Sequence, residues 1–441
     1  MSIIRKIQSG IYLGQEMSLK ALPVEPVTLS EHNRGSGHKS EGHLFCADNL
    51  EFMKSLKEAG YSGEIKTIYI DPPFFTRAKY DAVVTARCRD GGKKIHHLAY
   101  SDSSREDIES YVAFMTARLI LMRDLLADNG LIWIHLDWHS SHYVRLILDE
   151  VFGEDNFVNE IIWKYKSGGS SKNHFSRKHD TILVYCKAPG YYINIPKEKS
   201  YNRDMKPYKF KGVKEYEDES GWYTLVNMKD VWQINMVGRT SAERNGYATQ
   251  KPKELMKYII EASSRKGDMC ADFFCGSGSY LSAASELGRR WIGCDSGMLA
   301  ISLARKRLGI EGAAFHCMDG RGGIFDQVET DGSVKVALNG RSVQEDIYGS
   351  GEGLGRYGIS EFRPGIDYNK VAVKDRDKLK FIADSEPISL IDYVLVGEID
   401  KGNFIVKKTF GSHFDDMKVE WSENMVFKVV DIFGKEYISK Y

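Results

Sequence analysis

The sequence predicts an α/β fold, in which helices cover both faces of a parallel sheet, followed by a small β-rich C-terminal domain. Short apolar runs of the β type alternate along the chain with segments whose apolar residues recur at helical spacing. Two of these runs lead to an aspartate, Asp71 or Asp272, and then to proline or glycine. Strands separated by single helices pair in parallel and are buried on both faces. We therefore expect a sheet with functional side chains at its carboxyl edge.

Three strands and three helices are predicted in the first half of the chain. The strands are expected over 43–46, 65–70 and 131–136, and the helices from Asp48 onward, over about 104–128 and over about 140–152. Ser103 and Glu106 are spaced as a capping box, which predicts the start of the second helix. Asn129-Gly130 predicts the end of the same helix.

The pattern loosens over 164–247 and then resumes. Helices are expected over 254–263 and 279–287, and strands over 269–274 and 291–294. Alternating residues on both sides of Asp400-Lys401-Gly402 predict a hairpin of 393–399 with 403–409, and 425–432 is a further strand. We interpret the glycine-rich stretch near 338–358 as a linker to this C-terminal domain.

Composition indicates a protein with a packed core that meets a polyanion at one face. Apolar residues make up 42% and charged residues 28% of the chain, and the net charge is zero. There is no apolar run of about 18 residues, no signal-peptide pattern and no CxxC pair, so we expect a soluble cytoplasmic protein without a membrane span, disulfide framework or zinc ribbon. Within 161–215, however, 13 Lys and Arg face 4 Asp and Glu. Such a local basic segment is typical of a nucleic-acid-binding surface, although solvated lysines on loops give the same pattern.

The segment Asp272-Phe273-Phe274-Cys275-Gly276-Ser277-Gly278 leads from a strand through a glycine turn into a helix. Glycines let a ligand approach the backbone closely. Asp295 ends the next strand about 20 residues later, where an acid can hold ribose hydroxyls. Any α/β protein can carry such a turn. Because the third glycine of the dinucleotide fingerprint is missing, a nucleoside-bearing cofactor other than a nicotinamide is favoured.

The segment Asp71-Pro72-Pro73-Phe74 follows the predicted strand 65–70 directly. Proline lacks the donor that a central strand needs, so a simple strand-ending turn is one interpretation. The chemical interpretation starts from an exocyclic amino nitrogen, whose lone pair is delocalised into its ring. The Asp71 carboxylate and the Pro72 carbonyl can accept both N–H hydrogens and favour a pyramidal, nucleophilic nitrogen. Phe74 offers a ring on which the target base can stack.

Together these motifs resemble the amino-methyltransferase family of DNA modification enzymes. The catalytic motif precedes the cofactor motif, an order that resembles the beta class, which includes the modification subunits of type III restriction systems. Cys46-Ala47-Asp48-Asn49 is similar to a family element whose acid meets the cofactor's adenine, 114–157 is similar to the central block, and Gln250-Lys251-Pro252 to the entry of the cofactor helix. The resemblance covers about 43–188 and 247–308.

The resemblance implies a Rossmann-like methyltransferase sheet and S-adenosylmethionine as the cofactor. It implies that the cofactor is held by Asp48, Lys251, Asp272, Phe274, Gly276, Gly278 and Asp295. It implies that Asp71, Pro72, Pro73 and Phe74 hold a base flipped out of double-stranded DNA. No metal is part of the mechanism, which is direct methyl transfer.

Five segments follow from the resemblance and the composition. We expect a weakly ordered leader over 1–40, the catalytic half of the methyltransferase domain over 41–164, an inserted target recognition region over 165–246, the cofactor-binding half over 247–325 and the β-rich C-terminal domain over 340–441. The basic stretch 75–100 shows no regular period, and we expect it to be a loop that is mobile until DNA binds.

The expected activity is methylation of adenine N6 at a specific site in a restriction-modification or related system. The type III-like central block favours adenine. Cytosine N4 is the nearest alternative, because methylating its amino group requires the same chemistry from the site. RNA, a protein glutamine, or a catalytically idle DNA-binding specificity subunit remain alternatives. A restriction or other defence-system subunit is the expected partner, and a homodimer is compatible with the resemblance.

Two other interpretations are weaker. His135, His139 and His142 could ligate a metal, but they fall where the family has a strand end and a polar turn. Attack on a cytosine ring carbon would need a nucleophilic thiol, which in such enzymes follows a proline. No cysteine in this sequence follows a proline.

Overall fold

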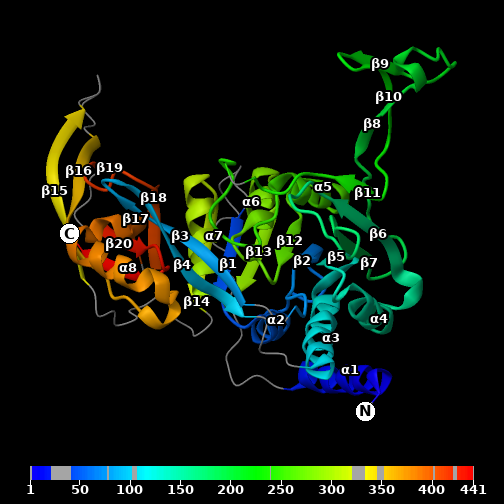
Figure 1. The fold of residues 1–441 in the computed structure, drawn as a ribbon, viewed down its shortest axis with the longest axis horizontal. Coiled ribbons are helices and arrows are strands. Elements are labelled where there is room, and N and C mark those ends of the chain that lie inside the picture. The colour runs from blue at the N-terminus through cyan, green and yellow to red at the C-terminus, as the bar shows by residue number, and fades with distance from the viewer. Residues whose placement is uncertain are drawn as a thin grey trace.

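A nine-stranded sheet forms the centre of the molecule (Figure 1). The computed structural model describes residues 2–20, 41–76, 79–101, 107–238, 240–319, 333–344, 352–400, 403–420 and 425–440. The strand order is β11-β6-β7-β5-β2-β12-β13-β1-β14. Their bounds are Val231–Gln233, Phe157–Lys164, His179–Cys186, Leu126–Leu136, Ile65–Ile70, Met269–Asp272, Arg290–Asp295, Glu41–Cys46 and Ala314–Asp319, in that order.

The sheet is parallel from β14 to β5, and β7 runs antiparallel between β5 and β6. The predicted α/β fold is thereby confirmed. Parallel strands end at one edge, so the residues that follow β1, β2, β12 and β13 come together there. Because β7 runs the other way, its first residues lie at the same edge.

Six helices cover the sheet. They are α2 (Asn49–Glu58), α3 (Ile108–Leu125), α4 (Ser141–Phe152), α5 (Lys253–Ser263), α6 (Ser279–Glu286) and α7 (Met298–Ile310). Side chains of α2, α3 and α4 pack with the sheet in one apolar cluster, and side chains of α5 and α6 pack with it in another. The core therefore lies on both faces of the sheet, as the near-continuous apolar strands predict. Among the helices of the described residues, none combines the length and the apolar character that crossing a membrane requires.

The predicted end of α3 at Asn129-Gly130 is wrong. The helix ends at Leu125, and Leu126 is already extended and pairs with Ile65 at the start of β5. Asn129-Gly130 lies inside β5, where the register with β2 shifts between its pairs. Sheet pairing has overridden the local turn signal. At the other end, the Asp107 side chain accepts from Ser110 N and caps the helix, whereas the predicted capping box falls on 103–106, outside the described residues.

The expectation of a weakly ordered leader over 1–40 is corrected for its first half. Residues Ile3–Leu19 form helix α1, which packs against α3. A Cβ at Gly10 would lie 2.6 Å from the Glu109 carbonyl oxygen, and one at Gly14 would lie 2.5 Å from Thr116 Cβ. The two glycines thus let the helix backbones approach closely. The polar stretch that suggested disorder, 21–40, lies outside the described residues.

The stretch expected to be a patternless loop, 75–100, forms the hairpin of β3 (Lys79–Cys88) and β4 (Gly91–Ser101). Its small apolar residues, Ala82, Val84 and Ala86, are buried together with Ile95 against the C-terminal domain. The signal was missed because these side chains are small and because Val83, which lies between two of them, weakens the contrast between an apolar and a polar face. Their covering partners also lie far along the chain.

The C-terminal domain contains the predicted β17–β18 hairpin (Ile391–Asp400 with Asn403–Phe410), extended by β20 (Met425–Asp431) and β21 (Glu436–Lys440). A second sheet joins β15 (Ser333–Gln344), β16 (Glu352–Arg363) and β19 (Met417–Glu420), and α8 covers Val373–Ser385. The expected linker near 338–358 is therefore wrong for its described residues. Residues 338–344 pair with residues 352–357 along β15 and β16.

The segment expected as an insertion, 165–246, divides into two parts. Strands β7 and β11 belong to the central sheet, while β8 (Lys197–Tyr201), β9 (Glu215–Asp218) and β10 (Gly221–Asn227) form a separate three-stranded arm. Figure 1 shows the arm standing away from the body. Short 3₁₀ turns cover Glu154–Asn156, Arg203–Met205, Tyr368–Lys370 and Pro387–Leu390.

His43, in the buried strand β1, makes stability depend on pH. It is 6% exposed and its ring lies 5.4 Å from that of His316. Burial, with the nearby charges of His316 and Arg290, lowers its pKa to about 4. The unfolded chain takes up this proton near its ordinary pKa of about 6.5, so stability is complete above that pH and is lost as the pH falls toward 4.

We expect the free energy of unfolding to fall by about 2 kcal/mol more between pH 7 and pH 5 in the native protein than in His43→Gln. Urea unfolding at the two pH values measures this difference. Glutamine does not titrate, so the other groups contribute equally to both proteins. Parallel losses in the two proteins would assign the proton to another group.

Candidate active site

A cavity of about 410 Å³ opens at the carboxyl edge of the sheet. Eight of the residues predicted from the sequence line it: Asp48, Asp71, Pro73, Lys251, Asp272, Phe274, Gly276 and Asp295. Pro72, Phe74 and Gly278 lie beside it without lining it. The cavity gathers residues that are up to 247 positions apart in the sequence, because β1, β2, β12 and β13 end side by side.

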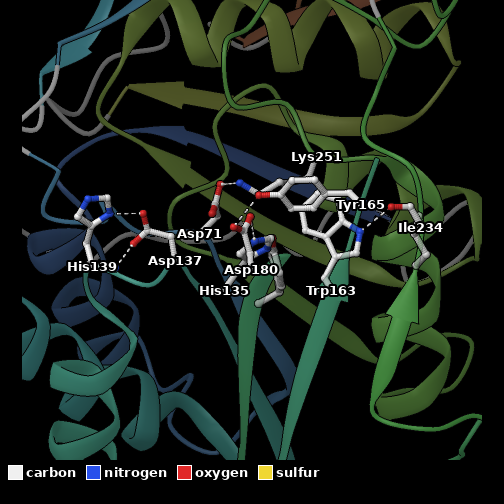
Figure 2. Close-up of polar contacts among 10 residues, drawn as sticks. Asp71, His135, Asp137, His139, Trp163, Tyr165, Asp180, Ile234 and Lys251 are labelled. Carbon is white, nitrogen blue, oxygen red and sulfur yellow. Dashed lines mark hydrogen bonds and ion pairs between the residues drawn. The ribbon is translucent and has the colours of Figure 1, made fainter. Parts of the chain in front are cut away.

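Asp71 and Lys251 form an ion pair in this cavity, with Lys251 Nζ 2.6 Å from Asp71 Oδ2 (Figure 2). Both side chains are largely buried, 16% and 12% exposed. The other carboxylate oxygen, Asp71 Oδ1, is buried without a hydrogen-bond partner. A buried acceptor without a partner costs about 1–3 kcal/mol, so this oxygen is ready for a donor. Lys251, predicted as a cofactor residue, here contacts the predicted catalytic carboxylate.

Pro72, Pro73 and Phe74 form the turn that follows Asp71, and this turn is fixed by contacts with its neighbours. The Pro73 carbonyl accepts a hydrogen bond of 3.1 Å from the Tyr111 hydroxyl, and Pro72 is buried. The Phe74 ring lies 6.1 Å from the His135 ring in a stacked orientation, and Lys251 Nζ lies 5.4 Å from the centre of the Phe74 ring. The turn therefore holds the Phe74 ring against His135 of β5.

A hydrogen-bonded network around His135 was not predicted. The Tyr69 hydroxyl lies 3.0 Å from His135 Nδ1, and His135 Nε2 lies 3.1 Å from Asp180 Oδ2. Tyr165 donates to the other oxygen of Asp180 at 3.1 Å (Figure 2). Burial raises the pKa of Asp180, but the hydrogen bonds from His135 and Tyr165 and the charge of Lys251 outweigh it, and the pKa is lowered. Asp180 is thus held as an anion beside the ion pair.

On the glycine side, two carboxylates shape the turn that follows β12. Phe274 N donates to Asp272 Oδ1 at 3.0 Å, and burial raises the pKa of this carboxyl well above its ordinary value. Asp295 accepts from Gly276 N at 2.9 Å and from Gly297 N at 2.8 Å, one on each oxygen. A carboxylate oxygen can accept a second bond, so Asp295 can also receive a hydroxyl.

Gly278 has a packing role. Its φ of +75° is left-handed, and a Cβ there would lie 2.9 Å from Ala304 Cβ on α7. Any other residue would separate the two helices. Gly276, at φ +49°, lines the cavity opposite the Tyr247 ring, which a Cβ would approach to 3.2 Å.

Asp48 belongs to a second cluster that the sequence did not reveal. Arg118 Nη2 lies 3.0 Å from Asp48 Oδ2, and Arg118 Nε donates to Asn49 Oδ1 at 2.5 Å. Asn49 in turn donates to the Phe273 carbonyl at 2.6 Å. The Arg118 guanidinium lies 3.6 Å from the centre of the Phe114 ring. This cluster ties α3 to the loops after β1 and β12, and its aromatic and polar faces line the cavity.

A family model described as DNA methylase, N6_N4_Mtase, matches residues 65–306, which is more than half of the chain. The chain belongs to this DNA methylase family. The matched range contains the Asp71 turn, the Tyr69–His135–Asp180 network and the glycine turn. Of the predicted site residues, only Asp48 precedes the match.

Several relatives resemble this DNA methylase. M.EcaI of Enterobacter cloacae, a Type II methyltransferase, is 30% identical over 305 residues, which cover 56% of this chain and 65% of the relative. The Type III restriction-modification enzyme StyLTI Mod subunit of Salmonella typhimurium is 30% identical over 202 residues, covering 40% of this chain and 29% of the relative. The crystal structure of the M1.HpyAVI-SAM complex aligns over 60% of this chain and 98% of its own, with 18% identity and a TM-score of 0.41. The chain thus spans less than two thirds of the first two relatives.

The histidines that suggested a metal site in this DNA methylase have other partners. His135 lies between Tyr69 and Asp180, and His139 Nδ1 lies 2.5 Å from Asp137 Oδ2. Within the part of the chain that the structure describes, no group of three or more His, Cys, Asp and Glu residues is placed to hold a metal ion.

Proposed function

We propose that this chain transfers a methyl group from S-adenosylmethionine to adenine N6 of a base flipped out of double-stranded DNA. The observation that carries the proposal is the Asp71 carboxylate. Lys251 holds one oxygen, and the other is buried without a partner at the edge of the cavity. An amino group of a base is the complementary donor. Membership in the DNA methylase family supports the same chemistry.

The cavity suits the proposed cofactor in size and charge. Its volume of about 410 Å³ falls within the range of small-molecule sites, about 300–1,000 Å³. Four carboxylates line it, from Asp48, Asp71, Asp272 and Asp295, against the two cations Arg118 and Lys251. An acidic cavity with aromatic walls fits a ligand with ribose hydroxyls, an adenine ring and a positive charge. S-adenosylmethionine, when bound, supplies an electrophilic methyl group on a sulfonium centre.

The residues of the chain then act on the amino nitrogen. Asp71 Oδ1 accepts one N–H and concentrates the lone pair on nitrogen, while Lys251 fixes the carboxylate in position. Phe74 stacks against the base, and the Asp180 network fixes the wall behind Phe74. The surplus proton of the methylated nitrogen leaves through Asp71 to solvent. No covalent intermediate with the protein is needed.

Adenine is proposed ahead of cytosine N4 because the order of the motifs and the central block resemble the type III modification subunits. Similarity to such a Mod subunit also supports a role in a restriction-modification system with a partner subunit. The region 165–246 is proposed to recognise the target sequence, since its arm and loops carry the basic and aromatic residues that contact phosphates and bases.

Methylation mapping by single-molecule sequencing tests the proposal. DNA from cells that express the chain should carry one N6-methyladenine motif that is absent from cells expressing Asp71→Ala. An N4-methylcytosine motif would replace adenine by cytosine as the target. Unmodified DNA, together with no methyl transfer by the purified protein, would reject the proposed activity.

A further inference from the structure

The loop between β6 and β7, whose base adjoins the Asp180 network, presents an exposed aromatic ring. Phe175 is 98% exposed, the highest value among the exposed large apolar residues of the described chain. It lies in the segment 166–177 between β6 and β7, which we name the Phe175 loop. A fully exposed phenylalanine loses the free energy that burial would provide, about 1.5–3 kcal/mol. A single exposed apolar residue needs no explanation by itself, so a function of Phe175 can be inferred only from its surroundings.

The Phe175 loop starts and ends at the target side of the active site. Tyr165 N donates to the Lys178 carbonyl at 3.1 Å and closes the loop at its base. The hydroxyl of the same tyrosine holds Asp180, whose partner His135 stacks on Phe74. Tyr165 therefore belongs both to the base of the loop and to the network beside the proposed base pocket, and Lys178 precedes Asp180 by two residues (Figure 2).

The loop has a defined shape. Lys178 Nζ donates to the carbonyls of Ser167 and Gly168 at 2.9 and 2.8 Å, and Ser171 N donates to Ser176 Oγ at 3.1 Å. The Arg177 guanidinium stacks 3.9 Å from the centre of the Trp138 ring, which is itself 49% exposed on the turn after β5. These contacts hold the loop against the catalytic body while leaving the Phe175 ring in solvent.

The charge of the loop is complementary to DNA. Residues 166–177 contain two lysines and one arginine and no acidic residue, and six of the twelve residues are glycine or serine. Small and cationic residues let a phosphate backbone approach closely. Apolar side chains that insert between base steps are a recognised means of opening a duplex.

We propose that Phe175 is a wedge that enters the duplex and fills the space left by the flipped target base. The inference rests on the proposed function and adds a positioning residue to it. Flipping breaks stacking and pairing, which costs a few kcal/mol. A ring that stacks on the neighbouring bases recovers part of this cost and slows the return of the target base. Phe175 touches the duplex rather than the reacting atoms, so its effect depends on how firmly the target base is paired.

The test compares two duplexes that carry the methylation motif found by mapping. In one the target base is normally paired, and in the other its partner is replaced by an abasic position, so the pair is already open. We expect Phe175→Ala to lower kcat/KM on the paired duplex by about tenfold to thirtyfold, and to act within about threefold of the native protein on the abasic duplex. Phe175→Trp, which keeps a stacking ring, should retain activity on both.

Three controls make the outcome decisive. Phe381→Ala removes another exposed ring, 70% exposed on α8, and should leave both rates unchanged. Asp71→Ala should be inactive on both duplexes, which separates opening from chemistry. Equal thermal unfolding of the Phe175→Ala and native proteins excludes misfolding.

Two results would overturn the wedge. Equal losses on both duplexes would place Phe175 on the flipped base or elsewhere in catalysis, and no loss on either would make it an idle surface residue. Methylation by the native protein in the same assay upholds the proposed function in both cases. A native protein that methylates neither duplex would remove the proposed function and the wedge with it.

Discussion

Asp71→Asn is expected to lower kcat by about a thousandfold or more while leaving the affinity for S-adenosylmethionine within about threefold. The amide keeps the size of the side chain but removes the negative charge that activates the amino nitrogen. The amide oxygen can still accept from Lys251, which lies 2.6 Å from Asp71 Oδ2 in the native protein, so the amide NH2 then faces the amino group where an acceptor is needed. Single-turnover methylation and titration calorimetry with the cofactor measure the two quantities separately.

Asp392→Asn is the matched control for this change. Asp392 is 17% exposed and paired with Lys306, as Asp71 is 16% exposed and paired with Lys251, but Asp392 does not line the cavity. It should keep full activity. A comparable loss of cofactor affinity in Asp71→Asn would instead make Asp71 part of the cofactor site.

Lys251→Met is expected to lower kcat by about a hundredfold, because it leaves the buried Asp71 carboxylate without its partner. The sequence resemblance implies a cofactor role for Lys251, whereas the ion pair places it on the carboxylate of Asp71, which we propose to be catalytic. A role through Asp71 and a role in cofactor binding would change different constants of the enzyme. A role through Asp71 lowers kcat with little change in cofactor Kd, and a cofactor role raises Kd by about tenfold or more.

The double variant Asp71→Asn, Lys251→Met sharpens this distinction. If Lys251 acts through Asp71, the double variant should be no slower than Asp71→Asn alone. Additive losses would show that Lys251 acts independently of the carboxylate. Lys306→Met removes the partner of Asp392 and controls for the loss of a half-buried lysine elsewhere.

The sequence predicted those features that depend on residues close together along the chain. The strand that ends at Asp71, the glycine turn after Asp272 and the alternation around Asp400 each depend on a few neighbours, and the structure places each one as a strand end or turn. The family motifs rest on the same local signals. Local signals also misled where pairing decided the outcome, as at Asn129-Gly130.

The contacts between distant residues could not be predicted. Lys251 meets Asp71 across 180 positions, and Arg118 meets Asp48 across 70. Such contacts depend on the strand order, which periodicity does not encode. Asp180 reaches the site only because β7 runs antiparallel to β5, so that the first residues of β7 lie at the carboxyl edge of the parallel strands. The residues that surround the predicted ones were therefore missed, while eight of those named by motifs line the cavity.

The β3–β4 hairpin is synthesised early, but it packs against the C-terminal domain, which is synthesised last. His96 N donates to Asp375 Oδ2 at 3.0 Å across 279 positions, and Arg89 N donates to Glu386 across 297. At a synthesis rate of about 5–20 residues per second, the apolar face of the hairpin would wait roughly 15–55 seconds for its cover to be synthesised. During that time Ala82, Val84 and Ile95 lack the C-terminal side chains of their shared apolar cluster. A stop codon before the last domain would therefore leave the apolar face of the β3–β4 hairpin without part of its cover.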